Sequence, residues 1–355
     1  MTDPRWAQLA DILVNYSTKV KKGEKVFITM MEPESLPLVE QVYSKVVQAG
    51  GLPQVEFVSA ILERELMRHG TMEQLDWIPG IQAYGMEWAD VYIGLRGFRN
   101  PYEFAGISDE RIAAHKKALG VTSSMRNATR WVLIRLPNEP FAQQAKTSVD
   151  DMIEFIFNAT LKDWSEEVKR YKEIADVFQA GENVRIVGKE TDISFSTKGR
   201  KYVVGDGEFN MPDGEIFTSP VDDSAEGQIY FEFPGVYAGK LIEGIRLEFS
   251  KGVVTKATAE DNEELLHNII KTDEGANRIG EFGVGTNFGI DRFSYDILYD
   301  EKIGGTIHLA LGRSFSECNG VNHSALHWDI VKDLRQGGVV YLDGNKVMEN
   351  GKFLI

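Results

Sequence analysis

The residues best suited to chemistry lie near the carboxyl end of the chain. His308, His327 and Asp329 fall within one short segment of a protein that has only six histidines. Imidazole and carboxylate groups are the usual protein ligands of zinc, manganese and non-haem iron. Two upstream carboxylates, Glu215 and Glu281, each lie beside glycine and turn residues where strand-like runs end. Together these five side chains predict a metal centre that holds two metals.

Each of these signals also has an ordinary structural interpretation. His327 and Asp329 are two positions apart, which places both on one face of a strand, but an ion pair at the start of a helix would have the same spacing. His308 lies in an apolar run that suits a buried, hydrogen-bonded histidine. Glu215 fits a turn. Glu281 enters a run with few polar neighbours, where a carboxylate is costly unless it is paired or metal-bound. The occurrence of all five residues in one sequence favours a metal centre over these separate structural roles.

Size and composition predict a globular protein of two domains. The chain has 355 residues, of which 43% are hydrophobic and 26% charged, and this length exceeds one typical core. Its formal net charge of −15 argues against nucleic acid as a partner, because phosphates demand a basic surface. No apolar run is long enough for a membrane span. The first residues lack the pattern of a signal peptide, and Cys318 is the only cysteine. We therefore expect a cytoplasmic protein without an internal disulfide.

The first half alternates strand-like runs with amphipathic helical runs. The strand-like runs are 25–30, 52–58, 89–97 and 130–137. This alternation is typical of βαβ units around a mainly parallel sheet. The first run is followed by MMEPESLP rather than a GxGxxG fingerprint, which argues against a dinucleotide site.

The residue pattern of the sequence changes near residue 180. Residues 148–180 have a helical pattern throughout, and from residue 183 onward short strand-like runs are separated by Gly, Asp and Pro. Such runs favour antiparallel sheet. We predict an N-terminal α/β domain over 1–180 and a C-terminal α+β domain over 181–355, and we expect the second domain to be catalytic and to bind the metals.

Four segments of the second half resemble, in the same order, the M29 metallopeptidases of the aminopeptidase T group. They are MPDGEIFTSP (211–220), EFGVGTN (281–287), GGTIHLALG (304–312) and NHSALHWDIV (322–331). The resemblance implies a homodimer whose C-terminal domains hold two divalent metals each, as zinc, cobalt or manganese. The ligands that it implies are Glu215, Glu281, His308, His327 and Asp329.

The activity implied by the resemblance is that of a metallo-aminopeptidase. Such an enzyme removes N-terminal residues from short peptides with a metal-activated water. Glu281 or Glu215 would then accept the proton of that water, and the sequence leaves this choice open. One position departs from the family pattern, because Phe315 stands where the family has tyrosine. Phenylalanine cannot bind a metal or donate a hydrogen bond to an oxyanion.

Two other functions compete with the peptidase. His308, His327 and Asp329 also match the facial triad of a mononuclear non-haem Fe(II) enzyme, and some relatives of this fold resemble dioxygenases that cleave hydroxylated pyridine rings. A single iron would not need Glu215 and Glu281. A non-catalytic protein with a structural metal is the third alternative, although buried acidic clusters without a function are costly.

Overall fold

The computed structural model describes residues 3–100 and 102–355, which form two compact units. One unit comprises residues up to 162 together with 207–212, and the other comprises 163–206 and 213–355. These units place 163–180 with the second part and 207–212 with the first. The predicted division into domains 1–180 and 181–355 stays a prediction.

The first unit is built on a parallel sheet with strand order β2-β1-β3-β4-β8. Its strands are β1 (Lys25–Met31), β2 (Leu52–Val58), β3 (Val91–Arg96), β4 (Arg130–Arg135) and β8 (Asn210–Met211). Its helices are α1 (Arg5–Asp11), α2 (Leu36–Gln48), α3 (Ala60–His69), α4 (Met72–Leu75), α5 (Gly80–Trp88), α6 (Asp109–Met125), α7 (Glu139–Gln144) and α8 (Val149–Thr160). The central strands are apolar and buried, as two-sided coverage of a parallel sheet requires.

The helical pattern over 148–180 is interrupted in the structure. Helix α8 ends at Thr160, and α9 (Trp164–Gln179) begins after Asp163, whose carboxylate accepts hydrogen bonds from the backbone N–H groups of Ser165 and Glu166. An aspartate in this role caps a new helix start. The stretch expected to be helical throughout is therefore divided into two helices.

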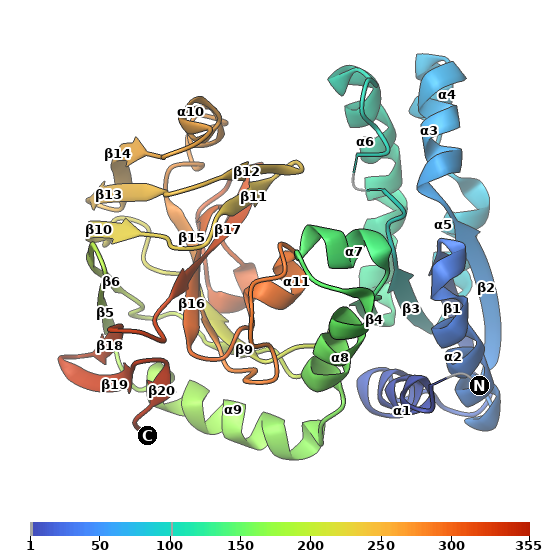
Figure 1. Ribbon diagram of the computed structural model, residues 1–355, viewed down its shortest axis with the longest axis horizontal. Coiled ribbons are helices and arrows are strands. Elements are labelled where there is room, and N and C mark those ends of the chain that lie inside the picture. Colours follow the sequence, from blue (N-terminus) through green and yellow to red (C-terminus); the bar gives the residue numbers. More distant parts are fainter. Residues whose placement is uncertain (1–2, 101) are drawn as a thin grey trace. The chain divides into compact units, whose positions relative to one another are not determined.

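The second unit is mainly antiparallel sheet. Its other helices are α10 (Glu263–Ile269) and α11 (Ile297–Asp300). An eight-stranded sheet has the order β14-β13-β10-β6-β5-β18-β19-β20, and a five-stranded sheet has the order β17-β16-β15-β9-β7 (Figure 1). The strands are β5 (Asn183–Gly188), β6 (Thr191–Ser196), β7 (Val203–Val204), β9 (Glu215–Thr218), β10 (Glu226–Tyr230), β11 (Gly235–Tyr237), β12 (Lys240–Ile242), β13 (Arg246–Ser250), β14 (Val253–Thr258), β15 (Ile279–Gly285), β16 (Thr306–Gly312), β17 (His327–Asp333), β18 (Val339–Leu342), β19 (Asn345–Glu349) and β20 (Lys352–Phe353).

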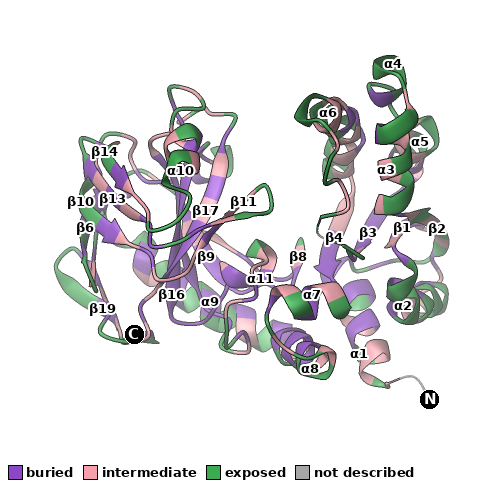
Figure 2. Ribbon diagram, turned by 45° about the horizontal axis from the view of Figure 1, so that its top comes forward, coloured by how far each residue is buried: buried purple, intermediate pink, exposed green. Residues whose placement is uncertain are grey.

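One face of the five-stranded sheet forms part of the main apolar core. Phe282 of β15 packs edge-on against Phe195 with ring centroids 5.1 Å apart, and Leu309 of β16 and Ile330 of β17 belong to the same core. Strand β16 is buried along its whole length (Figure 2). Because side chains alternate along a strand, the residues next to these core positions must point to the other face.

The predicted fold class is confirmed: a mainly parallel α/β part precedes an α+β part that is rich in antiparallel strands. Within the described residues, no helix is both long enough and apolar enough to cross a membrane.

Candidate metal centre

The five predicted ligands all lie on the face of the five-stranded sheet that is opposite the apolar core. His327 and Asp329 belong to β17, which is a strand, so the alternative of an ion pair at a helix start does not apply. His308 is on β16, Glu281 on β15 and Glu215 on β9. Alternation along each strand sends these polar side chains to one side while their apolar neighbours enter the core.

Small residues stand opposite the ligands in the neighbouring strands. In the strand register, His308 pairs with Gly283, and Glu215 pairs with Gly285. Ala310 lies between Glu281 and Asp329, one on each side of it. A Cβ added to Gly283 would lie 2.0 Å from Cε1 of His308. The glycines and the alanine therefore leave the space in which the longer polar side chains converge.

Six acidic and histidine side chains form two groups that could each hold a cation. The first cluster consists of Glu215, Glu301 and His308, and the second cluster consists of Glu281, His327 and Asp329. Within each cluster the three possible ligand atoms lie within 4.8 Å of one another. The structure thus brings all five predicted residues together and adds Glu301.

Glu281 links the two clusters. Its Oε1 lies 3.4 Å from Nε2 of His308 in the first cluster, and its Oε2 lies 3.1 Å from Nε2 of His327 in the second. Each histidine also contacts one further carboxylate of its own cluster, since His308 Nε2 is 3.5 Å from Glu215 Oε2 and His327 Nε2 is 3.5 Å from Asp329 Oδ2. The side chains therefore form one continuous polar site.

Backbone carbonyls orient both imidazole rings. Nδ1 of His308 lies 3.1 Å from the carbonyl oxygen of Glu301, and Nδ1 of His327 lies 2.8 Å from that of Arg313. A carbonyl oxygen can only accept, so each Nδ1 carries the proton and donates it. Nε2 of each ring is then directed at the carboxylates, which is the arrangement that metal-binding histidines require.

The donor atoms of both clusters suit divalent metals. Asp329 Oδ1 is buried without a hydrogen-bond partner, and Glu215 Oε2 is buried with only the ion-pair contact to His308. A buried carboxylate oxygen without a partner is costly, and a bound cation would remove that cost. Carboxylate and imidazole donors in this combination suit zinc, cobalt, manganese or iron. The residues present therefore fit a metal centre.

The electrostatics of the two clusters differ in the metal-free chain. Burial raises the pKa of Glu215 well above its ordinary value. Burial also acts to raise the pKa of Glu281, but the hydrogen bonds with His308 and His327 outweigh it and lower that pKa to about 2. Burial opposes protonation of both histidines, yet the carboxylates around them raise the pKa of His308 to about 10 and that of His327 to about 9. Both rings are thus cationic at neutral pH when no metal is bound.

Two neighbours of the site escaped the sequence analysis. Glu301 and Lys302 follow α11 in the turn that leads to β16. Lys302 is completely buried and pairs with the carboxylates of Glu215 and Glu301. The available signal was the run DEKIGG immediately before the strand of His308, because a charged run next to a buried strand must find partners inside the fold.

Phe315 packs directly against a ligand of the second cluster. Its ring centroid lies 4.8 Å from that of His327 and 5.6 Å from that of Phe217. Its backbone N–H donates to the hydroxyl of Ser219. The phenylalanine therefore supports the imidazole by an apolar contact and offers no ligand atom of its own.

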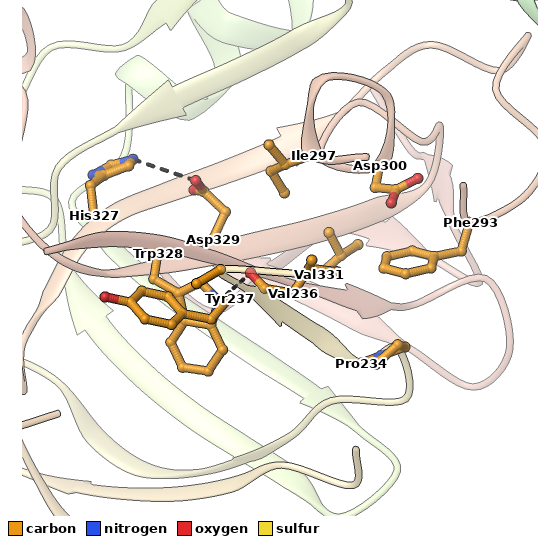
Figure 3. Close-up of a pocket in the computed structure, with 11 residues that line it drawn as sticks. Pro234, Val236, Tyr237, Phe293, Ile297, Asp300, His327, Trp328, Asp329 and Val331 are labelled. Carbon is orange, nitrogen blue, oxygen red and sulfur yellow. Dashed lines mark hydrogen bonds and ion pairs between the residues drawn. The ribbon is translucent and has the colours of Figure 1, made fainter. Parts of the chain in front are cut away.

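A cavity of about 160 Å³ borders the second cluster. Figure 3 shows His327 and Asp329 in one part of its wall and Phe293 and Asp300 in another. The lining residues are Pro234, Val236, Tyr237, Ala238, Phe293, Ile297, Asp300, His327, Trp328, Asp329 and Val331. Asp300 accepts hydrogen bonds from the N–H and the hydroxyl of Ser294, and burial raises its pKa well above the ordinary value. Apart from Asp300 and the predicted ligands His327 and Asp329, the side chains of the wall are mostly apolar.

Comparisons with known proteins find relatives that match this chain over nearly its whole length. Aminopeptidase PepS of Streptococcus thermophilus is 23% identical, and the match covers 98% of this chain and 97% of the relative. The structure of wild-type AmpT from Thermus thermophilus superposes with a TM-score of 0.88 at 22% identity and covers 99% of both chains. A 2,5-dihydroxypyridine dioxygenase from Pseudomonas putida KT2440 has a TM-score of 0.63 at 16% identity, over 98% of this chain and 96% of the dioxygenase, which is a likeness of fold alone.

The family comparison covers nearly the whole chain. The sequence profile described as thermophilic metalloprotease (M29) matches residues 2–353. This match spans both units and all six side chains of the two clusters. The chain therefore belongs to the thermophilic metalloprotease (M29) family and is a hydrolase.

Proposed function

We propose that this protein is a metal-dependent aminopeptidase that removes N-terminal residues from short peptides. The observation that supports this most strongly is the pair of three-ligand clusters on one sheet face, joined by Glu281, in a chain of the M29 family. The curated relative PepS carries the name aminopeptidase.

The six side chains would form two cation-binding positions. Glu215, Glu301 and His308 would hold one divalent ion, and His327 and Asp329 would hold the other. Glu281 faces both histidines and would be the ligand that the two ions share. Zinc, cobalt and manganese are the candidates. Bound at these positions, they would polarise a peptide carbonyl and make a water acidic enough to attack it near neutral pH.

The remaining steps belong to the residues around the metals. The cavity beside His327 and Asp329 would receive the N-terminal residue of the peptide, and its apolar wall would exclude water from that side. Glu281 or Glu215 would take the proton of the attacking water and pass it to the leaving amine. The two carboxylates differ in position, since Glu281 contacts both histidines while Glu215 contacts Lys302 and His308. Which of them accepts the proton stays a prediction, and separate glutamine variants would distinguish them.

The ring-cleaving alternative has less support. A facial triad needs His308, His327 and Asp329 around one ion, whereas His308 groups with Glu215 and Glu301, and the other two residues group with Glu281. The likeness to the dioxygenase concerns the fold. Elemental analysis separates the two functions: about two zinc, cobalt or manganese ions per chain support hydrolysis, and one iron with oxygen-dependent turnover supports ring cleavage.

The assembly and location are part of the same proposal. The resemblance to aminopeptidase T implies a homodimer, and the absence of a second cysteine suits the cytoplasm. Sedimentation at micromolar concentration tests the dimer directly, and a monomer there contradicts it.

The site assignment is tested by removing one ligand from each cluster. Glu215→Ala and His327→Ala should each lose metal and reduce peptide hydrolysis by at least about a hundredfold, because each removes a ligand of a different cation. His267→Ala is the matched control, since His267 is a partly buried histidine of α10 that contacts the carbonyl of Ala257 and belongs to neither cluster. Metal content, circular dichroism and release of the N-terminal residue from a dipeptide are measured. Parental rates in both ligand variants would show that the assignment is wrong.

A further inference from the structure

Lys302 places a positive charge inside the first cluster. Its side chain is 0% exposed, and Nζ lies 3.3 Å from Oε1 of Glu215 and also contacts Oε1 of Glu301. These two carboxylates are two of the three ligands that define the cluster. The ammonium of Lys302 and a cation bound in the first cluster would therefore share the carboxylates of Glu215 and Glu301.

In the part of the chain that the structure describes, the second cluster has no comparable lysine or arginine. Among residues 3–100 and 102–355, the carboxylates of Glu281 and Asp329 form ion pairs only with histidines. Histidine becomes neutral when it binds a metal through Nε2, whereas a paired lysine keeps its charge. When both histidines bind metal, the side-chain positive charge that remains among these residues is the ammonium of Lys302 in the first cluster.

The charge of Lys302 is held firmly by its surroundings. Nζ lies between the carboxylates of Glu215 and Glu301, and two anionic partners at contact distance favour the ammonium form. The backbone also fixes the residue, since the N–H of Lys302 donates to the carbonyl of Tyr299 and the carbonyl of Lys302 accepts from the N–H of Asn287. These bonds fix the backbone from which the buried side chain extends.

We infer that Lys302 makes the two metal positions unequal, so that the first cluster binds its cation more weakly and exchanges it more readily than the second. Two effects act in the same direction. The ammonium neutralises part of the charge of Glu215 and Glu301, and it repels a divalent cation a few ångströms away in a low-dielectric interior. The inference rests on the proposed metal centre and assigns a tightly held ion to Glu281, His327 and Asp329.

A purely structural role for Lys302 gives a different expectation. If the ammonium only balances the surplus negative charge of the turn, the two positions bind metal alike, and removing the lysine destabilises the protein without changing the order of metal binding. Metal affinity therefore separates the two roles, and enzyme activity is not needed for that decision.

The test is a titration of metal-free full-length protein with zinc or cobalt, followed by calorimetry. The parental protein should show two binding steps whose dissociation constants differ by about tenfold or more. Lys302→Met removes the charge and keeps an apolar side chain of similar length, so it should tighten the weaker step by about tenfold or more and leave the stronger step unchanged. Lys302→Arg keeps the charge and should keep the weak step.

Lys332→Met is the matched control for burying a methionine in place of lysine. Lys332 is also 0% exposed, but its partner is Glu232, which belongs to neither cluster. This variant should leave both metal steps as they are. His308→Ala assigns the steps, because it should remove the weak step and retain the strong one.

Several outcomes would overturn the inference. Two equal steps in the parental protein would do so without any variant, which keeps the test decisive if Lys302→Met fails to fold. Loss of the strong step in His308→Ala would also do so, as would a folded Lys302→Met with unchanged affinities. Peptide hydrolysis is measured separately: unequal metal binding without hydrolysis would refute the proposed function and leave this inference standing.

Discussion

The two clusters of the second unit share a sheet face and a linking glutamate, yet they are surrounded differently. In the first cluster His308 is 1% exposed, and the ammonium of Lys302 contacts two of the carboxylates. In the second cluster His327 is 18% and Asp329 13% exposed, and both line a cavity. Under the proposed function the second cluster would meet the substrate, and we infer that the first holds its cation more weakly.

The two clusters also differ in how their ligands are distributed along the sequence. The second cluster uses a short HxD run on one strand, where alternation alone brings His327 and Asp329 together. The first cluster joins Glu215, Glu301 and His308 from a strand, a turn and another strand. Only strand pairing and the turn after α11 bring those three into contact.

Among substitutions that leave every ligand in place, we expect the largest effect from a single Cβ that distinguishes the two clusters. Gly283→Ala would place that atom 2.0 Å from the ring of His308, so the imidazole must move and the first cluster should lose its cation while the second keeps one. We expect peptide hydrolysis to fall by about ten- to a hundredfold. Metal content per chain and hydrolysis rates are the measurements.

The control for this substitution is Gly120→Ala, because a Cβ at Gly120 meets nothing within 4 Å. It should leave metal content and rate unchanged. If Gly283→Ala retained two cations per chain at full activity, the space opposite His308 would not matter for metal binding.

A second prediction concerns pH and metal removal. In the metal-free chain the pKa of His308 is raised to about 10 and that of His327 to about 9, from an ordinary value of 6.5. Between about pH 6.5 and pH 9 the folded state binds more protons than the unfolded state. The free energy of unfolding must therefore fall as the pH rises. The stabilisation is complete below about pH 6.5 and is lost as the pH rises through about 9 to 10. Urea unfolding of chelator-treated protein across this range measures it.

Two comparisons sharpen the pH test. Metal-free His327→Ala should show a smaller decline with pH than the parental protein, because one of the two raised groups is gone. Metal uptake at neutral pH should release protons, since both rings must become neutral to bind. A stability that is constant or rises between pH 6.5 and 9 would contradict the protonation states described for the two histidines.

The smallest expected effect tests the open side of the second cluster. Ile297 lines the cavity beside His327 and Asp329 and is 44% exposed, so Ile297→Trp should narrow the cavity without touching a ligand. We expect KM for a dipeptide to rise by about three- to tenfold with metal content unchanged. Val121→Trp is the matched control, because Val121 is also 44% exposed and lies in the first unit. Equal KM values in the two variants would show that the cavity does not receive the substrate.

Much of the fold could be predicted from the sequence because local patterns carry it. Alternating runs indicated the parallel sheet, and β1, β2, β3 and β4 lie where they were expected. The break between α8 and α9 was missed, because the apolar period continues across 161–163 while the carboxylate of Asp163 starts a new helix. Strand β8 extends the sheet of the first unit although it follows 163–206 in the sequence. No local pattern reveals such a long-range pairing.

By itself, the sequence determined the ligand types, the strands that carry most of them and the family to which the chain belongs. Residue chemistry and strand alternation are local properties, so Glu215, Glu281, His308, His327 and Asp329 could be proposed as one set. Only the tertiary structure decided how that set divides, that Glu301 joins it, and that Lys302 lies among its carboxylates. These facts depend on which strands pair and on which buried charges face each other, and such contacts are settled when the whole sheet has formed.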